Sequence, residues 1–109
     1  MKNSFRSSRD VIIRTDAWAA AKEFYGSVLG FSLVSESETL LGVETGSFRL
    51  YLEKGKSHGP VFDFLVPDVQ AAKRKLIAAG CTLVEEDASV PRCYLRDPYG
   101  LVFNLGRAD

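Results

Sequence analysis

The sequence repeats itself at an interval of about fifty residues. When the second half is laid on the first, Val61 falls on Asp10 and Gly80 falls on Gly30. Each half begins with a strand-like alternation, continues into a helix-like segment that ends at a glycine, and then has three short strand-like runs. Because an internal repeat constrains the architecture more than any single segment does, the chain is predicted to contain two βαβββ modules.

The predicted elements follow the same order in both halves. The first half has a strand at 10–15, a helix at 17–29 with Asp16 as its cap and Gly30 as its end, and strands at 31–35, 39–44 and 48–53. The second half has a strand at 61–66, a helix between an Asp68 cap and Gly80, and strands at 81–85, 92–96 and 101–105. Apolar residues recur at helical spacing in both helices: Ala21, Phe24, Tyr25 and Val28, then Val69, Ala72 and Leu76. Each helix therefore has an apolar stripe to bury.

A helix buries such a stripe by covering one face of a sheet, which leaves the other face open. The sequence therefore predicts an α+β fold in which two βαβββ modules form a curved, mainly antiparallel sheet with helices on the outer face. We expect residues 1–9 to be a flexible N-terminus and residues 10–109 to be a single domain, with module one at about 10–55 and module two at about 60–107. Function is expected on the open face of the sheet, which we call the inner face.

Composition and charge exclude several classes of protein. The 14 basic residues balance the 14 acidic ones and form no long block, so the basic face that binds nucleic acid is not expected. No apolar run reaches the roughly 18 residues of a membrane span. The polar first ten residues lack the apolar core of a secretory signal. We therefore expect a cytoplasmic protein that has neither a nucleic acid nor a membrane as a partner.

The sequence contains two cysteines and one histidine. Cys81 and Cys93 are too few and too isolated for a disulfide framework or a zinc motif, so buried free thiols are expected. His58 lies in a loop of glycine, lysine and serine that nothing in the sequence brings near either thiol. No catalytic residue is predicted.

The tetrapeptide Asp97-Pro98-Tyr99-Gly100 favours a type I turn with glycine in the left-handed position after it. This hairpin would pair Leu95 with Phe103 and Cys93 with Leu105, all facing the helix. The alternate residues of the two strands would then share the inner face: Tyr94, Arg96, Val102 and Asn104.

Three stretches resemble known signatures. FYGSVLGF at 24–31 and LRDPYGLVFNLG at 95–106 resemble the paired signatures of the glyoxalase / bleomycin-resistance / ring-cleaving dioxygenase superfamily, also called vicinal oxygen chelate proteins. VPDVQAAKRKLIAAG at 66–80 is similar to the second helix of that superfamily. The resemblance extends from about residue 10 to residue 106 and implies a homodimer, since proteins of this kind are commonly dimeric.

The resemblance also raises the question of a metal, because enzymes of this superfamily usually hold a divalent ion with histidine or glutamate. The four ligand positions carried over from the family are Asp10, Tyr51, Val61 and Asn104. Only Asp10 is an ordinary ligand, because valine cannot coordinate and neutral tyrosine and asparagine coordinate weakly. No metal or other cofactor is therefore expected. A weak hard-cation site of Asp10, Glu53 and Asp63 stays open, as does the alternative that Asp63 pairs with an arginine.

Strand alternation predicts a mixed set of ligand-binding residues on the inner face. They are Asp10, Ile12, Arg14, Arg49, Tyr51, Glu53, Val61, Asp63, Leu65, Tyr94, Arg96, Val102 and Asn104. Small-molecule pockets have this composition, in which aromatic residues supply contact area and charged groups orient the ligand. A planar or amphipathic ligand with an anionic or hydrogen-bonding group is therefore predicted. Each residue also has a structural interpretation, in which the tyrosines pack against a second subunit and Asn104 satisfies a neighbouring backbone group.

Four aromatic residues outside this set are interpreted structurally. Trp18 is expected to be a half-buried cover at the start of the first helix. Tyr99 is expected to be exposed at the tip of the turn, and Phe62 and Phe64 are expected in the core.

Three functions follow from the fold and the resemblance. The first is a metal-free small-molecule binding protein of the bleomycin-resistance kind, linked to antibiotic resistance, which holds an aromatic or amphipathic ligand in the cup of a homodimer. The second is a metal-dependent lyase, isomerase or transferase related to glyoxalase, in which an ion polarises oxygens of the substrate. The third is a non-catalytic dimerisation or regulatory module. A metal-free acid/base enzyme that uses Asp10 or Asp63 is the weakest reading, since neither carboxylate has a visible partner.

Overall fold

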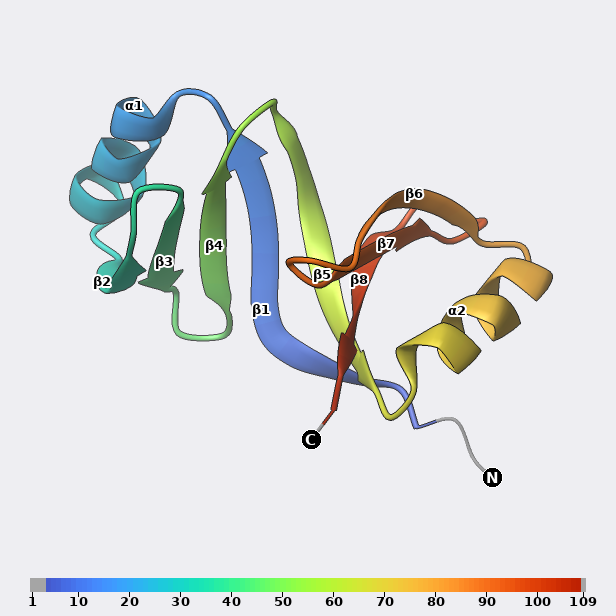
Figure 1. Ribbon diagram of the computed structural model, residues 1–109. Helices are drawn as coiled ribbons and strands as arrows, with labels where there is room; N and C mark the ends of the chain where they lie inside the picture. Colours follow the sequence, from blue (N-terminus) through green and yellow to red (C-terminus); the bar gives the residue numbers. More distant parts are fainter. Residues whose placement is uncertain (1–3, 109) are drawn as a thin grey trace. The chain divides into compact units, whose positions relative to one another are not determined.

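The computed structural model of the protein describes residues 4–108 and contains both predicted βαβββ modules (Figure 1). Module one consists of β1 (Arg6–Thr15), α1 (Trp18–Glu23), a π-helical turn η1 (Phe24–Val28), β2 (Ser32–Glu36), β3 (Leu40–Glu44) and β4 (Arg49–Lys54). Module two consists of β5 (His58–Val66), α2 (Val69–Ala78), β6 (Thr82–Asp87), β7 (Arg92–Arg96) and β8 (Val102–Arg107). The predicted α+β fold of two such modules is thereby confirmed.

The two modules have the same strand order. It is β2-β3-β4-β1 in module one and β6-β7-β8-β5 in module two. The first and last strands of each module are parallel neighbours, β1 with β4 and β5 with β8, and the other pairs are antiparallel. Each module is therefore a mixed sheet in which antiparallel pairing predominates.

Two compact units divide the chain, and their limits differ from the predicted ones at the N-terminus. Residues 9–60 form one unit, and residues 61–108 form the other together with the described residues up to Ser8. β1 begins at Arg6, so residues 6–9, which we expected in a flexible N-terminus, belong to a strand. Residues 1–3 of that predicted N-terminus, and the last residue of the predicted domain, lie outside the described residues.

The core of module one lies between β3, β4 and the first helix. Its buried residues are Leu41, Val43, Leu50 and Leu52. Trp18, Ala21 and Tyr25 pack against this cluster, which confirms Trp18 as a partly buried cover. The prediction was wrong for Phe24 and Val28, whose exposed fractions are 46% and 66%. For Val28 the reason is the π-helical turn, in which the Leu29 N–H donates to the Phe24 carbonyl at 2.9 Å, because its wider spacing rotates the following residues away from the core.

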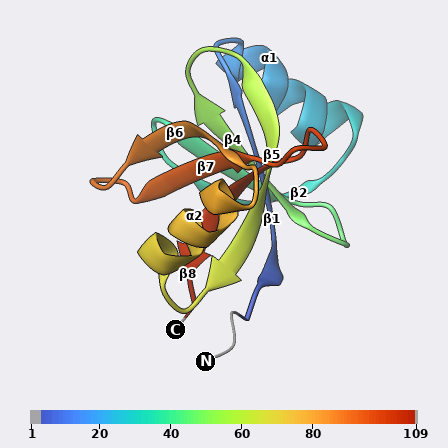
Figure 2. The same ribbon diagram turned by 90° about the vertical axis from the view of Figure 1, so that its right-hand side faces the viewer.

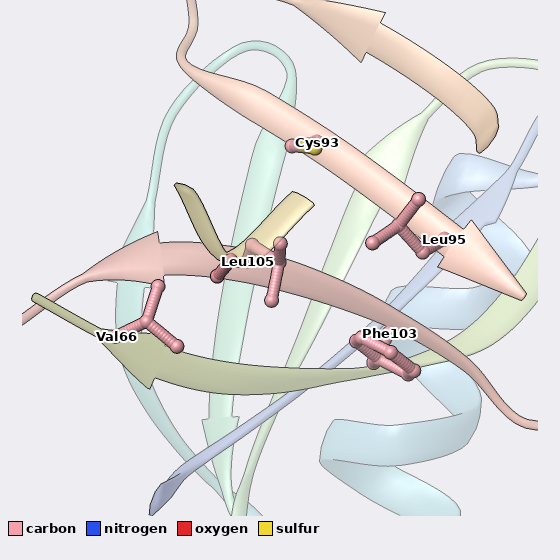
Figure 3. Close-up of a cluster of buried hydrophobic side chains, with 6 residues drawn as sticks. Val66, Cys93, Leu95, Phe103 and Leu105 are labelled. Atoms are coloured by element: carbon pink, nitrogen blue, oxygen red, sulfur yellow. The ribbon is translucent and has the colours of Figure 1, made fainter. Parts of the chain in front are cut away.

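The core of module two lies between α2 and the strands β5, β7 and β8 (Figure 2). Figure 3 shows Val66, Phe103 and Leu105 with Cys93 and Leu95, all of which are buried. Leu95 pairs with Phe103, as the turn predicted, and this face of the hairpin points toward the helix.

Phe64 packs on this core, with its ring centroid 4.8 Å from that of Phe103. Phe62 does not, and 36% of its surface is exposed. Its predicted core position was wrong because the helix covers β5 at Phe64 and Val66 and does not reach the preceding residue of that face.

The ends of the helices test the predicted caps. Asp68 caps α2, since the Ala71 N–H donates to its Oδ1 at 3.0 Å. Asp16 does not cap α1, because that helix begins one residue later than predicted and has Ala17 at its N-cap position. The Ala17 N–H donates instead to Thr15 Oγ1 at 3.1 Å.

The predicted turn between β7 and β8 is also present. The Asp97 carboxylate accepts hydrogen bonds from the N–H groups of Tyr99 and Leu101, and Gly100 has the expected positive φ of 104°. Tyr99 at its tip is 92% exposed, as expected. Among the helices that residues 4–108 form, none is long and apolar enough to cross a membrane.

Candidate functional site

On module one, the six predicted inner-face residues form three cross-strand pairs between the parallel strands β1 and β4. The pairs are Asp10 with Arg49, Ile12 with Tyr51, and Arg14 with Glu53. The intervening residues of both strands face the core, so the predicted alternation of the two strands is correct.

The charged residues of this face neutralise one another. The Arg49 guanidinium lies 2.9 Å from Asp10 Oδ1, and Arg14 Nε donates to Glu53 Oε1 at 3.1 Å. The two ion pairs flank the Ile12–Tyr51 pair and run in opposite directions, with the acid on β1 in one and on β4 in the other. Arg14 and Arg49 are therefore committed to carboxylates of the same face.

Tyr51 lies across the neighbouring strand β3, where a residue without a side chain makes room for it. A Cβ atom added at Gly42 would lie 2.8 Å from Tyr51 Cε1 and 2.6 Å from Ser35 Oγ. Gly42 pairs with Tyr51 in the register of β3 and β4, and with Ser35 in that of β2 and β3. The aromatic ring thus rests on the glycine, and this contact was not predicted from the sequence.

On module two, Asn104 links β8 to the strands on both sides of it. Its Nδ2 donates to Asp63 Oδ1 on β5 at 3.0 Å, and its Oδ1 accepts from the Cys93 N–H on β7 at 2.9 Å. The other oxygen of Asp63 accepts from Ser8 Oγ at 2.8 Å. The structural interpretation of Asn104, as a residue that satisfies a neighbouring backbone group, is therefore correct. Asp63 was predicted to pair with an arginine, but its contacts among residues 4–108 are with Asn104 and Ser8.

Tyr94 continues this face and lies beside an ion pair that the sequence did not suggest. The Arg92 guanidinium sits 5.2 Å from the centroid of the Tyr94 ring and donates to Glu85 Oε2 at 2.7 Å. Arg92 lies two residues before Tyr94 on β7, so strand alternation could have placed it on the inner face. The position of Glu85 could not be predicted in this way, because the register between β6 and β7 shifts between Leu83 and Glu85 and moves Glu85 to the inner face.

The remaining predicted residues differ in exposure. Val61 and Tyr94 are buried, with exposed fractions of 1% and 4%. Leu65 and Val102 are partly buried, and Arg96 is exposed. A Cβ atom added at Gly106 would lie 3.1 Å from Leu65 Cδ2 and 3.4 Å from Asp63 Oδ1, so Leu65 and Asp63 both approach the backbone of β8.

Both cysteines are free thiols, as predicted, but only Cys93 is buried, and Cys81 is partly exposed. Burial, with the nearby Asp97 charge as a smaller cause, raises the pKa of the Cys81 thiol above its usual value. Burial also raises the pKa of the Cys93 thiol, and the charge of Glu86 adds to that rise. Because the thiolate is the nucleophile, neither environment activates its sulfur.

The residues at the four family ligand positions do not fit a metal ion. Asp10 pairs with Arg49, and Asn104 uses its only carbonyl oxygen to accept the Cys93 N–H. Val61 has no donor atom, and the Tyr51 hydroxyl is a poor ligand while it is neutral. Within residues 4–108, no three side chains of His, Cys, Asp or Glu are grouped closely enough to hold an ion.

Solved structures with a similar fold have little sequence in common with this chain. Homoprotocatechuate 2,3-dioxygenase from Brevibacterium fuscum, in complex with 3,4-dihydroxyphenylacetate, has a TM-score of 0.69 and 20% identity over 96% of this chain and 37% of the dioxygenase. The Mn(II)-bound glyoxalase from Novosphingobium aromaticivorans has a TM-score of 0.66 and 20% identity over 97% of this chain and 40% of its own. This chain thus spans well under half the length of either enzyme.

A structure of matching length is a hypothetical protein from Bacillus halodurans C-125, with a TM-score of 0.69 and 12% identity over 97% of this chain and 96% of its own. No curated protein matches the sequence. A family model described as a glyoxalase-like domain matches residues 10–106, which is nearly the whole chain. The chain therefore belongs to the glyoxalase-like domain family, within the glyoxalase and vicinal oxygen chelate superfamily.

Proposed function

We propose that the protein is a metal-free small-molecule binding protein of the bleomycin-resistance-like type, which acts in the cytoplasm and holds an aromatic or amphipathic ligand on its inner faces as a homodimer. The observation that carries this proposal is the chemistry at the four family ligand positions. The Asn104 side-chain oxygen accepts a backbone N–H, Asp10 is paired with Arg49, and Val61 has no atom that can bind a metal. A divalent ion would have to break two existing interactions to gain two weak or moderate ligands.

The ion pairs of the inner-face arginines restrict the charge that the ligand can carry. The sequence predicted Arg14, Arg49 and Arg96 beside a ligand with an anionic or hydrogen-bonding group. Arg96 is exposed and takes part in no ion pair among residues 4–108, but Arg14 and Arg49 each have a carboxylate partner in the chain, as does Arg92 beside Tyr94. An anionic ligand would have to compete with these carboxylates and would leave them unpaired. The part of the proposed ligand that contacts Ile12 and Tyr51 is therefore planar and uncharged, and it hydrogen-bonds with the surrounding polar groups.

The test combines elemental analysis with ligand binding. Protein purified without chelator is expected to contain far less than one equivalent of nickel, zinc, manganese or iron. Equilibrium dialysis against a panel of neutral aromatic drugs and metabolites is expected to find a ligand whose binding is unchanged by EDTA. A stoichiometric metal together with metal-activated turnover would overturn the proposal.

A second candidate is a metal-dependent lyase, isomerase or transferase of the glyoxalase kind. It is favoured by the fold neighbours, one of which is named as a Mn(II)-bound glyoxalase. In such an enzyme the ion would polarise substrate oxygens. The elemental analysis above separates the two candidates, because only the metal-dependent enzyme requires bound metal for turnover.

A further inference from the structure

Module two has a groove between its helix and its strands, and none of the predicted inner-face residues lines it. It has a volume of about 270 Å³ and lies where the start of α2 faces the ends of β6, β7 and β8. We call it the α2 groove and define it by Val69, Gln70, Pro91, Cys93, Leu105 and Arg107. Its volume is slightly below the roughly 300–1,000 Å³ of pockets for drug-sized ligands, so its occupant has to be smaller than a drug.

The walls of the α2 groove are mainly apolar. Cys93 and Leu105 are each 3% exposed and belong to the buried core, so they form its floor. Val69 packs on the same core from the first turn of α2, and Pro91 closes the side of the β6–β7 turn. An apolar body placed here would remove both its own surface and that of the groove from water.

Three charged side chains line the α2 groove, and two of them, Glu86 and Arg92, are in ion pairs. Lys73 Nζ lies 2.7 Å from Glu86 Oε1, and Arg92 is paired with Glu85. Arg107 is exposed and takes part in no ion pair among residues 4–108.

Arg107 also borders a neighbouring depression of the surface. A second, open depression of about 370 Å³ shares Val69, Gln70 and Arg107 with it and adds Asp68. The carboxylate of Asp68 is engaged as the cap of α2, where it accepts the Ala71 N–H. A ligand lying on the apolar floor would therefore end beside the Arg107 guanidinium.

We propose that the α2 groove is a second binding site, separate from the inner-face site, that takes a small apolar carboxylate. The apolar part would lie on Cys93 and Leu105, and the carboxylate would pair with Arg107, whose planar guanidinium matches two carboxylate oxygens. The site uses no residue of the predicted inner-face set.

The probe is sodium benzoate, with benzyl alcohol as its neutral counterpart, added to the full chain labelled with nitrogen-15. Benzoate is expected to shift the amide signals of Val69, Gln70 and Leu105 with a Kd of about 1 mM, and benzyl alcohol to bind several-fold more weakly. The Cys93 amide is left out of the comparison because it donates to Asn104 on the inner face. The readout therefore does not depend on whether the inner-face ligand exists.

Two variants and one control complete the test. Arg107→Gln is expected to weaken benzoate binding about threefold to fivefold, and Arg74→Gln, the same change at an exposed position of α2 outside the groove, to leave it unaltered. Ala88→Trp, at an exposed turn position on the groove wall, is expected to abolish the shifts while the rest of the spectrum stays native. The proposal fails if benzoate causes no shifts at these amides, if Arg107→Gln behaves like Arg74→Gln, or if Ala88→Trp binds as the native chain does.

Discussion

At the scale of single residues, Asn104 shows how an inner-face position is used when no metal is expected there. One side chain satisfies a donor on β7 and an acceptor on β5, so the amide joins three strands of module two. Strand alternation correctly placed Asn104 on the inner face. The bond to a backbone group of β7 agrees with the predicted hairpin, in which β7 is the partner of β8. The bond to Asp63 was not predictable from the sequence, because β5 becomes a neighbour of β8 only in the folded sheet.

Asn104→Leu is expected to destabilise the protein by about 2–3 kcal/mol, because it leaves the Cys93 N–H and a carboxylate oxygen of Asp63 without their partner. Urea unfolding measures the free energy. The matched control is Asp63→Asn, which still offers an oxygen to the Asn104 amide and is expected to cost less than about 1 kcal/mol. An equal decrease in the free energy of unfolding of the two variants would show that the hydrogen bond to the Cys93 N–H contributes little to stability.

Gly42→Ala is expected to destabilise by about 1–3 kcal/mol, because its Cβ would overlap Tyr51 and Ser35. Gly26→Ala is the control, since no heavy atom lies within 4 Å of a Cβ at that helical position, and it is expected to be neutral or to stabilise by about 0.5–1 kcal/mol. Thermal unfolding compares the two. If Tyr51 causes the clash, the cost of Gly42→Ala will shrink in a Tyr51→Ala background, and an unchanged cost would exclude that cause.

At the scale of elements, the predictions that held are those that local chemistry decides. α2 begins after Asp68 because that side chain accepts the Ala71 N–H, and the β7–β8 hairpin keeps its register because Asp97 and Gly100 shape the turn. The first helix departs from its prediction at Phe24, where the chain enters a π-helical turn that its apolar spacing does not reveal. The bulge in β6 likewise leaves no signal in the sequence. Its one extra residue inverts the alternation of the strand, so Glu85 was not predicted on the inner face.

The two candidate caps give a test at this scale. Asp68→Ala is expected to destabilise by about 1 kcal/mol, because it removes the acceptor for an N–H at the start of α2. Asp16→Ala is expected to change stability by less than about 0.5 kcal/mol, because Asp16 is exposed and does not cap α1. The two free energies of unfolding are compared in urea, and a larger loss for Asp16→Ala would contradict the assignment of the caps.

At the scale of the whole molecule, the prediction that concerns the chain as a unit is the homodimer. Module one carries half-exposed apolar side chains along η1 and β2: Phe24, Val28, Leu29, Leu33 and Val34. β2 ends the strand order of its module, and an exposed edge of this kind calls for cover. Sedimentation equilibrium is expected to give twice the 12.0 kDa mass of the chain. A mass that stays at one chain up to high protein concentration would remove the dimer from the proposed function.

The two modules, the α+β fold, the start of α2, and the face on which each residue of β1, β4, β7 and β8 lies could all be predicted from the amino-acid sequence. These follow from periodicity, caps and turn geometry, all of which act between residues close together in the chain. The folded chain was needed to show that Arg14 and Arg49 pair with carboxylates and that Asn104 hydrogen-bonds with Cys93 and Asp63. The contacts of Arg14, Arg49 and Asp63 join parallel strands far apart in sequence, and parallel pairing gives no local signal of which residues become neighbours.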